Sequence, residues 1–364
     1  MRVLVVNAGS ASLKLRLLDS DDAVRASRDL EARGGRIDAG QLDTAVREIG
    51  EADAVGHRIV HGGRRFRQAV ILDAAVLAEL RELSALAPLH QPPALAAVDA
   101  VARLLPGTPA VGCFDTAFHA GLPEAASTYA LPAEWRERWQ LRRYGFHGLS
   151  HAYAARRAVA LAGAHAGARV VSCHLGAGAS LAAVREGRSV DTTMGFTPLE
   201  GLVMATRSGN VDPGLLLWLL EHGGLSEAEL SDSLEHRSGL AGLAGTGDMR
   251  EVLERAQSGA SDARLALEVY VHRLRAGVAA MAAAMGGLEV LAFTGGVGEN
   301  AASVRLAAAA GLSFLGVAVD ERRNLAARGD TEIGDPDATV RVFVIAARED
   351  LEIAREVREV VSGR

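Results

Sequence analysis

The chain has 364 residues, of which 49% are hydrophobic, and a formal net charge of −6. Its length predicts about two domains of roughly 150 residues each, with enough apolar side chains for large cores. The negative charge argues against a nucleic-acid or membrane-surface partner, so an anionic ligand would have to be held by local donors.

The two cysteines, Cys113 and Cys173, do not have the spacing of a metal site. We expect two buried free thiols in a reducing compartment. The first residues have the pattern of a strand rather than of a charged and then apolar leader. No apolar run approaches the roughly 20 residues that a membrane-spanning helix needs. The sequence therefore predicts a cytoplasmic protein with no membrane partner.

Residues 2–18 are predicted to form a β-hairpin. An apolar run reaches Asn7, the chain turns at Gly9, and the following residues alternate with the period of a strand. One face carries leucines, and the other carries hydroxyls and Lys14. We expect the leucines to anchor the hairpin and its polar face to approach a ligand, with Gly9 permitting a tight turn. A short polar stretch follows over residues 20–40.

The rest of the first half alternates between strands and helices. Residues 52–63 read as a buried strand that ends in a Gly-Gly turn, and residues 73–87 have helical spacing. Residues 92–107 predict a helix with proline in its first turn and Pro-Gly at its end. Residues 109–115 predict a short strand that ends at Asp115. Strands followed by helices predict an α/β fold.

The second half begins as the first does. Residues 169–181, RVVSCHLGAGASL, match residues 2–13, RVLVVNAGSASL, with one gap. A duplicated unit would explain this likeness. Since strand, glycine turn and strand is a common sequence pattern, chance explains it equally well at this point.

A third glycine turn follows an apolar run that ends at Thr294. We expect a glycine loop there, with helical sequence resuming near Ala301. This geometry presents backbone N–H groups to phosphate. The segment lacks a Walker lysine, and GGVGEN is not the spaced dinucleotide pattern, so it indicates phosphate only weakly.

Phosphoryl transfer requires donors for phosphate oxygens, a metal, and positive charge on the transferring group. Candidate side chains stand at predicted strand ends or in loops: Asn7, Lys14, Arg58, Asp115, His147, Arg207 and Glu349. Each also has a structural explanation. Arg58 could be paired within its strand, Asp115 could cap a turn, and Glu349 could favour the dipole of a starting helix. Residue types alone do not decide between these interpretations.

Nine segments in chain order make the interpretation specific. They are NAGSASLK, GHRIVHGG, APLHQPP, FDTAFH, RRYGFHGLSH, HLGAGAS, TTMGFTPLEGLVMATRSG, TGGVGEN and EDLEIARE. Together they closely resemble the acetokinase family, nearly from end to end.

The resemblance implies the fold of the sugar-kinase, actin and heat-shock-chaperone ATPases. This is an α/β fold of two duplicated ribonuclease-H-like domains with a nucleotide cleft between them. We expect an N-terminal domain from residues 1–117 plus 351–364, shortened between 20 and 52. Residues 118–350 would form a nucleotide-binding and dimerisation domain, so the resemblance also implies a homodimer.

The activity implied is reversible, Mg²⁺-dependent transfer of the ATP γ-phosphate to acetate, giving acetyl phosphate and ADP, with Mn²⁺ as a substitute ion. A propionate or other short-chain acyl kinase is the nearest alternative. An actin- or chaperone-like ATPase shares the fold and would need no carboxylate. A nucleotide-binding regulator without chemistry is a third class. The retained set of charged candidates argues against the last two.

The resemblance also implies residue roles. Asn7 and Glu349 match the magnesium pair, and Asp115 matches the acidic catalytic residue. His147 and Arg207 match stabilisers of the transferring phosphoryl group. The substrate-binding matches are Arg58, which would bind the carboxylate or acyl phosphate, and a small apolar pocket of Val60, Leu89, Phe146 and Pro198. The nucleotide-binding matches are Ser10, Ser12, Lys14, His174, Leu175, Gly176, Ala177, Gly178, Asp248, Met249, Arg250, Gly296, Val297, Gly298, Glu299 and Asn300.

The chain departs from the family pattern at three places. Ala177 stands where the motif has Asn, which removes one side-chain hydrogen bond near the phosphates. Ala11 replaces a serine of the first motif. The segment between the first hairpin and GHRIVHGG is shorter than in the family.

Overall fold

The computed structural model describes residues 1–9, 12–31, 37–87 and 90–363. Predictions for Ser10, Ala11 and Leu89 therefore lie outside the described residues. The chain divides into two compact units. The first unit consists of Met1–Gly121, Phe146–Tyr153 and Arg348–Arg364. The second unit consists of Leu122–Gly145 and Ala154–Ala347.

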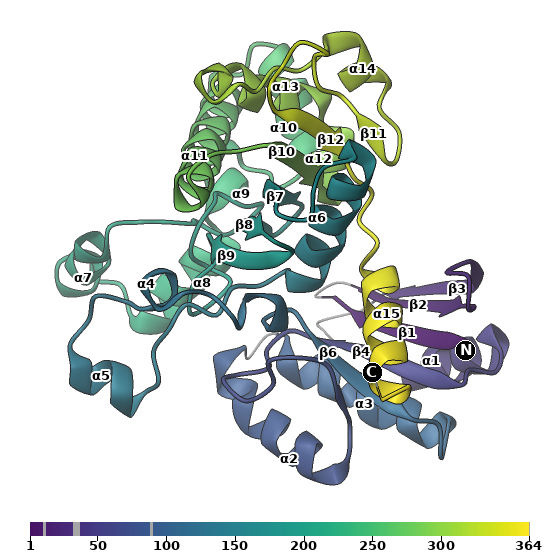
Figure 1. The fold of residues 1–364 in the computed structure, drawn as a ribbon. Coiled ribbons are helices and arrows are strands. Elements are labelled where there is room, and N and C mark those ends of the chain that lie inside the picture. The colour runs from purple at the N-terminus through teal and green to yellow at the C-terminus, as the bar shows by residue number, and fades with distance from the viewer. Residues whose placement is uncertain (10–11, 32–36, 88–89, 364) are drawn as a thin grey trace. The chain divides into compact units, whose positions relative to one another are not determined.

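The first unit contains a six-stranded sheet in the order β3-β2-β1-β4-β6-β5 (Figure 1). The strands are β1 (Val3–Ala8), β2 (Ser12–Leu18), β3 (Val24–Glu31), β4 (Ala54–Ile59), β5 (Val70–Ile71) and β6 (Ala110–Phe114). β1, β4 and β6 are parallel, while β2, β3 and β5 run antiparallel to their neighbours. The predicted hairpin and both later strands are confirmed.

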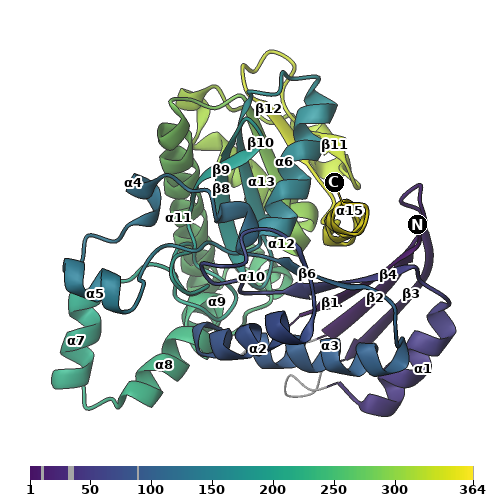
Figure 2. The ribbon, with the colours of Figure 1, turned by 60° about the horizontal axis from the view of Figure 1, so that its bottom comes forward.

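Helices cover both faces of this sheet. α1 (Ala39–Ile49) and α3 (Gln91–Leu104) pack beside each other on one face, as Figure 2 shows. α15 (Glu349–Val361) packs on the other face, through Ile353 and Val357. A Cβ on Gly56 of β4 would lie 2.5 Å from Ile353, so glycine lets α15 approach the sheet. α2 (Ala74–Glu82), η1 (Leu83–Leu86) and η2 (Ala117–His119) complete the elements of this unit up to residue 121.

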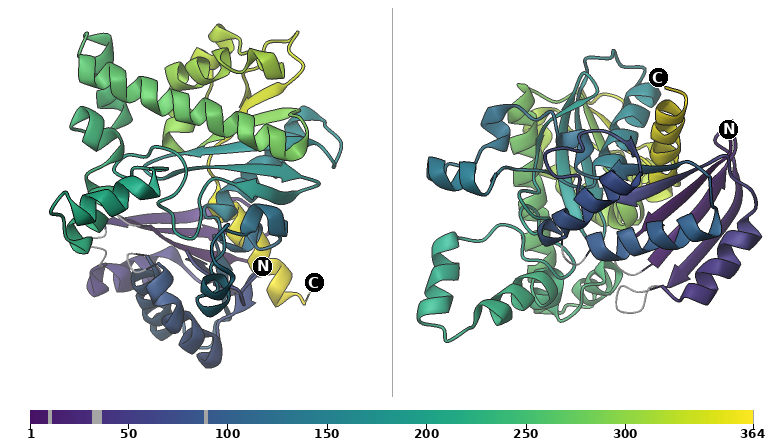
Figure 3. Two further views of the ribbon diagram at one scale, coloured as in Figure 1. Left: turned by 90° about the vertical axis from the view of Figure 1, so that its left-hand side faces the viewer. Right: turned by 90° about the horizontal axis from the view of Figure 1, so that it is seen from below.

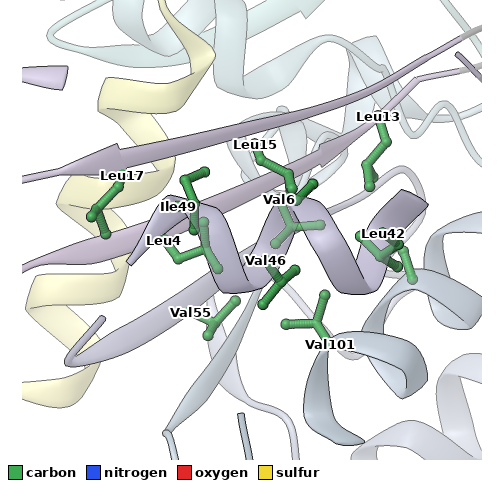
Figure 4. Packing of buried hydrophobic residues seen from close by; sticks show 12 residues of the cluster. Leu4, Val6, Leu13, Leu15, Leu17, Leu42, Val46, Ile49, Val55 and Val101 are labelled. Carbon is green, nitrogen blue, oxygen red and sulfur yellow. The ribbon is translucent and has the colours of Figure 1, made fainter. Parts of the chain in front are cut away.

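The hairpin leucines lie in the core, as the alternation predicts. Leu13, Leu15 and Leu17 of β2 point toward α1, where Leu42, Val46 and Ile49 belong to the same cluster (Figure 4). Lys14 is exposed on the opposite side of the strand. The backbone N–H of Gly9 donates to the carbonyl of Ser12 at 2.8 Å.

The second unit repeats the topology of the first. Its sheet has the order β11-β12-β10-β7-β8-β9. The strands are β7 (Arg169–Leu175), β8 (Ala179–Arg185), β9 (Arg188–Thr192), β10 (Val290–Thr294), β11 (Thr331–Glu332) and β12 (Arg341–Val344). β7, β10 and β12 are parallel, and the other three are antiparallel to their neighbours. Each strand thus has a counterpart of the same position and sense in the first sheet, which supports duplication over chance.

The long helix α11 (Ser261–Met285) packs along β7, β8 and β9 of this second sheet; it is the long green helix in the left panel of Figure 3. α6 (Gly148–Ala162) begins in the first unit and continues into the second. The remaining helices are α4 (Glu124–Ser127), α5 (Ala133–Arg138), α7 (Pro213–Glu221), α8 (Glu227–His236), α9 (Gly239–Ala244), α10 (Met249–Gln257), α12 (Gly295–Asn300), α13 (Ala302–Ala310), η3 (Ser313–Leu315) and α14 (Glu321–Ala326). No helix in the described part of the chain is both long enough and apolar enough to span a membrane.

One segment contains a strand that was not predicted, and one expectation is corrected. The polar stretch over 20–40 contains the strand β3, whose residues are mostly exposed because it lies at the sheet edge. The expected glycine loop after Thr294 is the helix α12. Gly295, with φ of 77°, makes the turn from β10 into this helix, and a Cβ there would lie 2.8 Å from the carbonyl of Leu175.

Candidate functional site

Four of the predicted site residues come together in the first unit. Asn7 lies near the end of β1, Arg58 lies in β4, and Asp115 directly follows β6. Because these three strands are parallel, their carboxyl ends share one edge of the sheet. Glu349 is the first residue of α15 and reaches the same edge, since its Oε2 accepts a hydrogen bond from Asn7 Nδ2 at 2.7 Å.

Arg58 is the centre of this group. Its Nη2 lies 2.6 Å from Asp115 Oδ2, and its Nε donates to Oδ1 at 3.2 Å, which is a two-pronged pairing. Its Nη1 donates to the carbonyl of Ala8 at 3.2 Å and lies 3.5 Å from Asn7 Oδ1. Glu349 Oε2 is 3.9 Å from Arg58 Nε. One guanidinium therefore faces two carboxylates.

Burial controls the electrostatics here. Asp115 is 1% exposed, and desolvation raises its pKa, while the charge of Arg58 opposes the rise. Desolvation acts to lower the pKa of Arg58, but Asp115 and Glu349 outweigh it, so the pKa of Arg58 is raised. With both carboxylates ionised, the three groups carry a net negative charge. A bound cation would relieve this charge.

Asn7 and Glu349 fit the oxygen ligands that magnesium prefers. Within the described ranges, no three or more His, Cys, Asp or Glu side chains are grouped so as to hold a metal. Magnesium in phosphoryl-transfer enzymes is held by one or two carboxylates together with substrate phosphates and water. A small protein ligand set is therefore compatible with the magnesium ion that the family resemblance implies.

His147 adjoins this group through the backbone. The N–H of Gly148, which starts α6, donates to the carbonyl of Asp115 at 2.9 Å. His147 has φ of 57°, a left-handed conformation that is uncommon for a residue with a side chain. Such strain clusters at functional sites. The His147 ring meets the ring of His151 one turn along α6, with 6.4 Å between ring centroids.

Two of the predicted acyl-pocket residues, Val60 and Phe146, are buried in the first unit. The carbonyl of Phe146 is 3.0 Å from Nε2 of His119. Pro198 belongs to the second unit, where its carbonyl accepts a hydrogen bond from Arg207 Nη1 at 3.2 Å. Desolvation lowers the pKa of Arg207, and Glu235 opposes this shift.

The second unit contains a pocket of about 820 Å³. Predicted nucleotide-binding residues from three separate segments line it: Gly176, Ala177, Asp248, Met249, Arg250, Gly296, Val297 and Asn300. The predicted residues that do not line it are His174, Leu175, Gly178, Gly298 and Glu299. Ser12 and Lys14 belong to the first unit, in β2.

The pocket is lined by both polar and apolar side chains. Asp248 caps α10 by accepting from the N–H of Arg250 at 2.9 Å, and it pairs with the Arg250 guanidinium at 2.6 Å. Asn300 Nδ2 donates to the carbonyl of Gly296 at 2.8 Å. Met249 and Val297 supply apolar surface suited to a flat ring. Ala177 adds no side-chain donor, as its sequence departure indicates.

Sequence reasoning missed several residues that line this pocket. They are Leu240, Gly247, Leu253, Tyr270 and Ala301. Gly247 adjoins the predicted segment 248–250 and could have been included with it. Leu253 and Tyr270 lie within helices α10 and α11, where an apolar or aromatic residue has the same pattern as ordinary core.

Known proteins match this chain over most of its length. The acetokinase family profile matches residues 37–355. The acetate kinase of Carboxydothermus hydrogenoformans is 42% identical, with 100% of both chains covered. That alignment spans 398 positions, more than the 364 residues of this chain, so the relative carries positions that this chain lacks.

Solved structures match over nearly the whole chain as well. The crystal structure of Porphyromonas gingivalis acetate kinase has a TM-score of 0.90 at 37% identity, covering 99% of both chains. A propionate kinase from Francisella tularensis has a TM-score of 0.90 at 35% identity, again covering 99% of both chains.

Proposed function

The chain belongs to the acetokinase family, and from this premise we propose that it is an acetate kinase. It would transfer the γ-phosphate of ATP reversibly to acetate, giving acetyl phosphate and ADP. One observation in the structure carries the proposal. Arg58, a guanidinium suited to planar two-oxygen anions, lies at the carboxyl ends of three parallel strands beside Asp115, Asn7 and Glu349.

Direct in-line transfer fits these residues. Acetate is already ionised at pH 7, so it needs no general base to become nucleophilic. Asp115 would therefore hold the Arg58 guanidinium in orientation, and with it the carboxylate, rather than remove a proton. The main tasks of the protein are positioning and neutralising charge. Arg58 would bind the acetate oxygens, and Val60 and Phe146 would surround the methyl group.

His147 and Arg207 are proposed to stabilise the phosphoryl group during transfer. Both would donate hydrogen bonds to its oxygens as negative charge spreads over them. The pocket lined by Gly176, Asp248 and Gly296 would hold the nucleotide. ATP and ADP are the phosphate donor and product that the family implies.

Asn7 and Glu349 would hold the magnesium ion, with Mn²⁺ as a substitute. Bound magnesium would offset the repulsion between the carboxylate and the triphosphate. The surplus negative charge around Arg58 and the 2.7 Å contact between Asn7 and Glu349 support this placement.

A propionate or other short-chain acyl kinase is the second candidate. The propionate kinase structure and the acetate kinase structure match this chain with the same TM-score of 0.90. The chemistry would be the same and only the pocket would differ. One methylene is worth about 1–3 kcal/mol in such a pocket, so overlapping activities are expected.

We also propose a homodimer that works in the cytoplasm and takes part in forming acetyl-CoA from acetate. Support for the dimer comes from the second unit. α7 exposes Leu215, Leu217 and Trp218, and Trp135 and Trp139 at α5 are half exposed. In Figures 1 and 2, α5 and α7 project on the same side of the second unit. Exposed aromatic and apolar groups of this kind are typical of protein interfaces.

Trapping acyl phosphate with hydroxylamine tests the proposed activity. Purified protein with Mg²⁺ and ATP should yield acyl hydroxamate from acetate. Comparing kcat/KM for acetate, propionate and butyrate then decides between the two candidates. Absence of acyl phosphate from every short-chain acid, with any nucleoside triphosphate or pyrophosphate as donor, would contradict both.

A further inference from the structure

We propose that Gln91 is a positioning residue that fixes the walls of the acyl pocket and thereby sets the preference among short carboxylic acids. This inference rests on the proposed function, since it concerns the same pocket. Gln91 is the first residue of α3 and is fully buried.

The side-chain amide of Gln91 holds both backbone groups of one residue. Its Oε1 accepts from the N–H of His61 at 3.2 Å, and its Nε2 donates to the carbonyl of His61 at 3.0 Å. Nε2 also lies 3.4 Å from the carbonyl of Leu80. β4 ends at Ile59, so Gln91 holds the backbone of a residue two positions beyond the end of this strand.

His61 connects the Gln91 side chain to the proposed acyl pocket. It directly follows Val60, and its ring meets the ring of Phe146 edge-on, with 5.6 Å between centroids. The next residue is also held, because the N–H of Gly62 donates to Thr116 Oγ1 at 3.0 Å. A shift of His61 would therefore move two walls of the proposed pocket, Val60 and Phe146.

The chemistry of Gln91 favours this role over simple filling of the core. A buried amide is costly unless its donors and acceptors are paired, so an apolar residue would fill the same space at lower cost. Acids that differ by one methylene can differ about 10–200-fold in kcat/KM in a close-fitting pocket. Such discrimination requires that the residues lining the pocket stay in place when the larger acid binds. The hydrogen bonds from Gln91 to His61 would keep the adjacent Val60 in place.

Two variants test the inference against a control. Gln91→Met keeps approximate volume and removes both hydrogen bonds to His61, and Gln91→Asn keeps the amide but shortens its reach. Val46→Ala removes buried volume from α1 in the same unit without altering residues 60–62. Hydroxamate rates with acetate, propionate and butyrate, and the KM for ATP, are measured for all three.

Gln91→Met should lower the ratio of kcat/KM for acetate to that for propionate about three- to tenfold, as a yielding wall loses part of the methylene discrimination. The KM for ATP should stay unchanged, and Gln91→Asn should show a smaller change in the same direction. Val46→Ala should leave the ratio unchanged. Faster amide exchange of residues 60–62 in either Gln91 variant would show that the segment has been released.

An unchanged ratio in both Gln91 variants of an otherwise active enzyme would overturn this inference alone. So would equal losses for all acids and for ATP, matching those of Val46→Ala, because Gln91 would then support only the fold. If Gln91→Met does not fold, Gln91→Asn decides. A wild-type protein that forms no acyl phosphate would overturn the proposed function and this inference together.

Discussion

Gly148 donates its backbone N–H to the carbonyl of Asp115 at 2.9 Å, and a Cβ at position 148 would lie 2.1 Å from that same oxygen. This contact joins the start of α6 to the end of β6. His147 directly precedes Gly148, so this hydrogen bond also fixes the backbone of His147 relative to Asp115. The spacing leaves room for glycine alone.

Gly148→Ala should lower the free energy of unfolding by about 2–3 kcal/mol, since the added methyl forces the backbone apart. Activity should fall as well, because His147 and Asp115 would separate. Gly121→Ala is the matched control in the same unit, as a Cβ there meets no atom within 4 Å. Denaturant unfolding and hydroxamate rates measure both effects. Equal behaviour of the two variants would show that the contact is not needed.

Arg58→Lys should raise the KM for acetate at least about tenfold, because an ammonium keeps the charge but loses the two-pronged geometry. The KM for ATP should change little. Lysine is preferable to alanine here, since removing the charge would leave Asp115 buried without its partner. Steady-state kinetics with each substrate varied in turn provide the measurement. Equal increases in the KM for acetate and the KM for ATP would show that Arg58 does not bind the carboxylate specifically.

Arg207→Ala should lower kcat by about 10²–10³, the scale of a lost transition-state donor. Arg237→Ala is the control, since Arg237 is an exposed arginine of the same unit. The melting temperatures of both variants are compared with that of the parent protein. A nearly unchanged kcat in Arg207→Ala would exclude Arg207 from phosphoryl stabilisation.

Glu356 on α15 predicts a pH dependence of stability. Burial raises its pKa to about 7, with the charges of Glu352 and Glu359 adding to the rise and Cys113 and Arg355 opposing it. Between pH 4.5 and 7 the folded state therefore binds more protons than the unfolded state, so this group lowers stability as pH rises through that window.

Glu356→Gln should remove this dependence and raise the free energy of unfolding at pH 8 by about 2–3 kcal/mol, with little effect at pH 4.5. Glu51→Gln serves as control, since Glu51 is a largely exposed carboxylate of the same unit. Urea unfolding at several pH values measures the slopes. A slope that Glu356→Gln leaves intact would contradict the assignment.

Leu217→Glu combined with Trp218→Glu should convert the proposed dimer into monomers, because two charges would be buried in the interface. Sedimentation velocity gives the mass of each species. Phe314→Glu places one charge at another exposed apolar position of the same unit and should leave the dimer intact. A wild-type protein that sediments as a monomer would contradict the dimer itself.

The sequence predicted most of the first unit because its signals are local. Alternation in β2, the proline at the start of α3 and the Gly-Gly turn after β4 each mark an element without reference to distant residues. Resemblance to the family identified Arg58, Asp115, Asn7 and Glu349 as site residues, and the structure brings these four together. Their roles in catalysis stay predictions.

What the sequence did not predict depends on surroundings that no local pattern records. β3 lacks the apolar alternation of a strand because most of its residues face water at a sheet edge. The segment GGVGEN forms a helix because Gly295 makes the turn and the carbonyl of Leu175 leaves no room for a side chain. Tyr270 lines the pocket from within a core helix, where its spacing matches ordinary packing.

The placement of α15 has a consequence for synthesis of the chain. Val3, Val5 and Val111 of the first sheet pack against Ile353 and Val357, which the ribosome makes long after it has made these three valines. During translation these valines are synthesised long before α15, so the nascent sheet exposes an apolar face until α15 has been made and has packed on it. Chains truncated before residue 348 should therefore aggregate or be bound by chaperones, even though both of their sheets are complete.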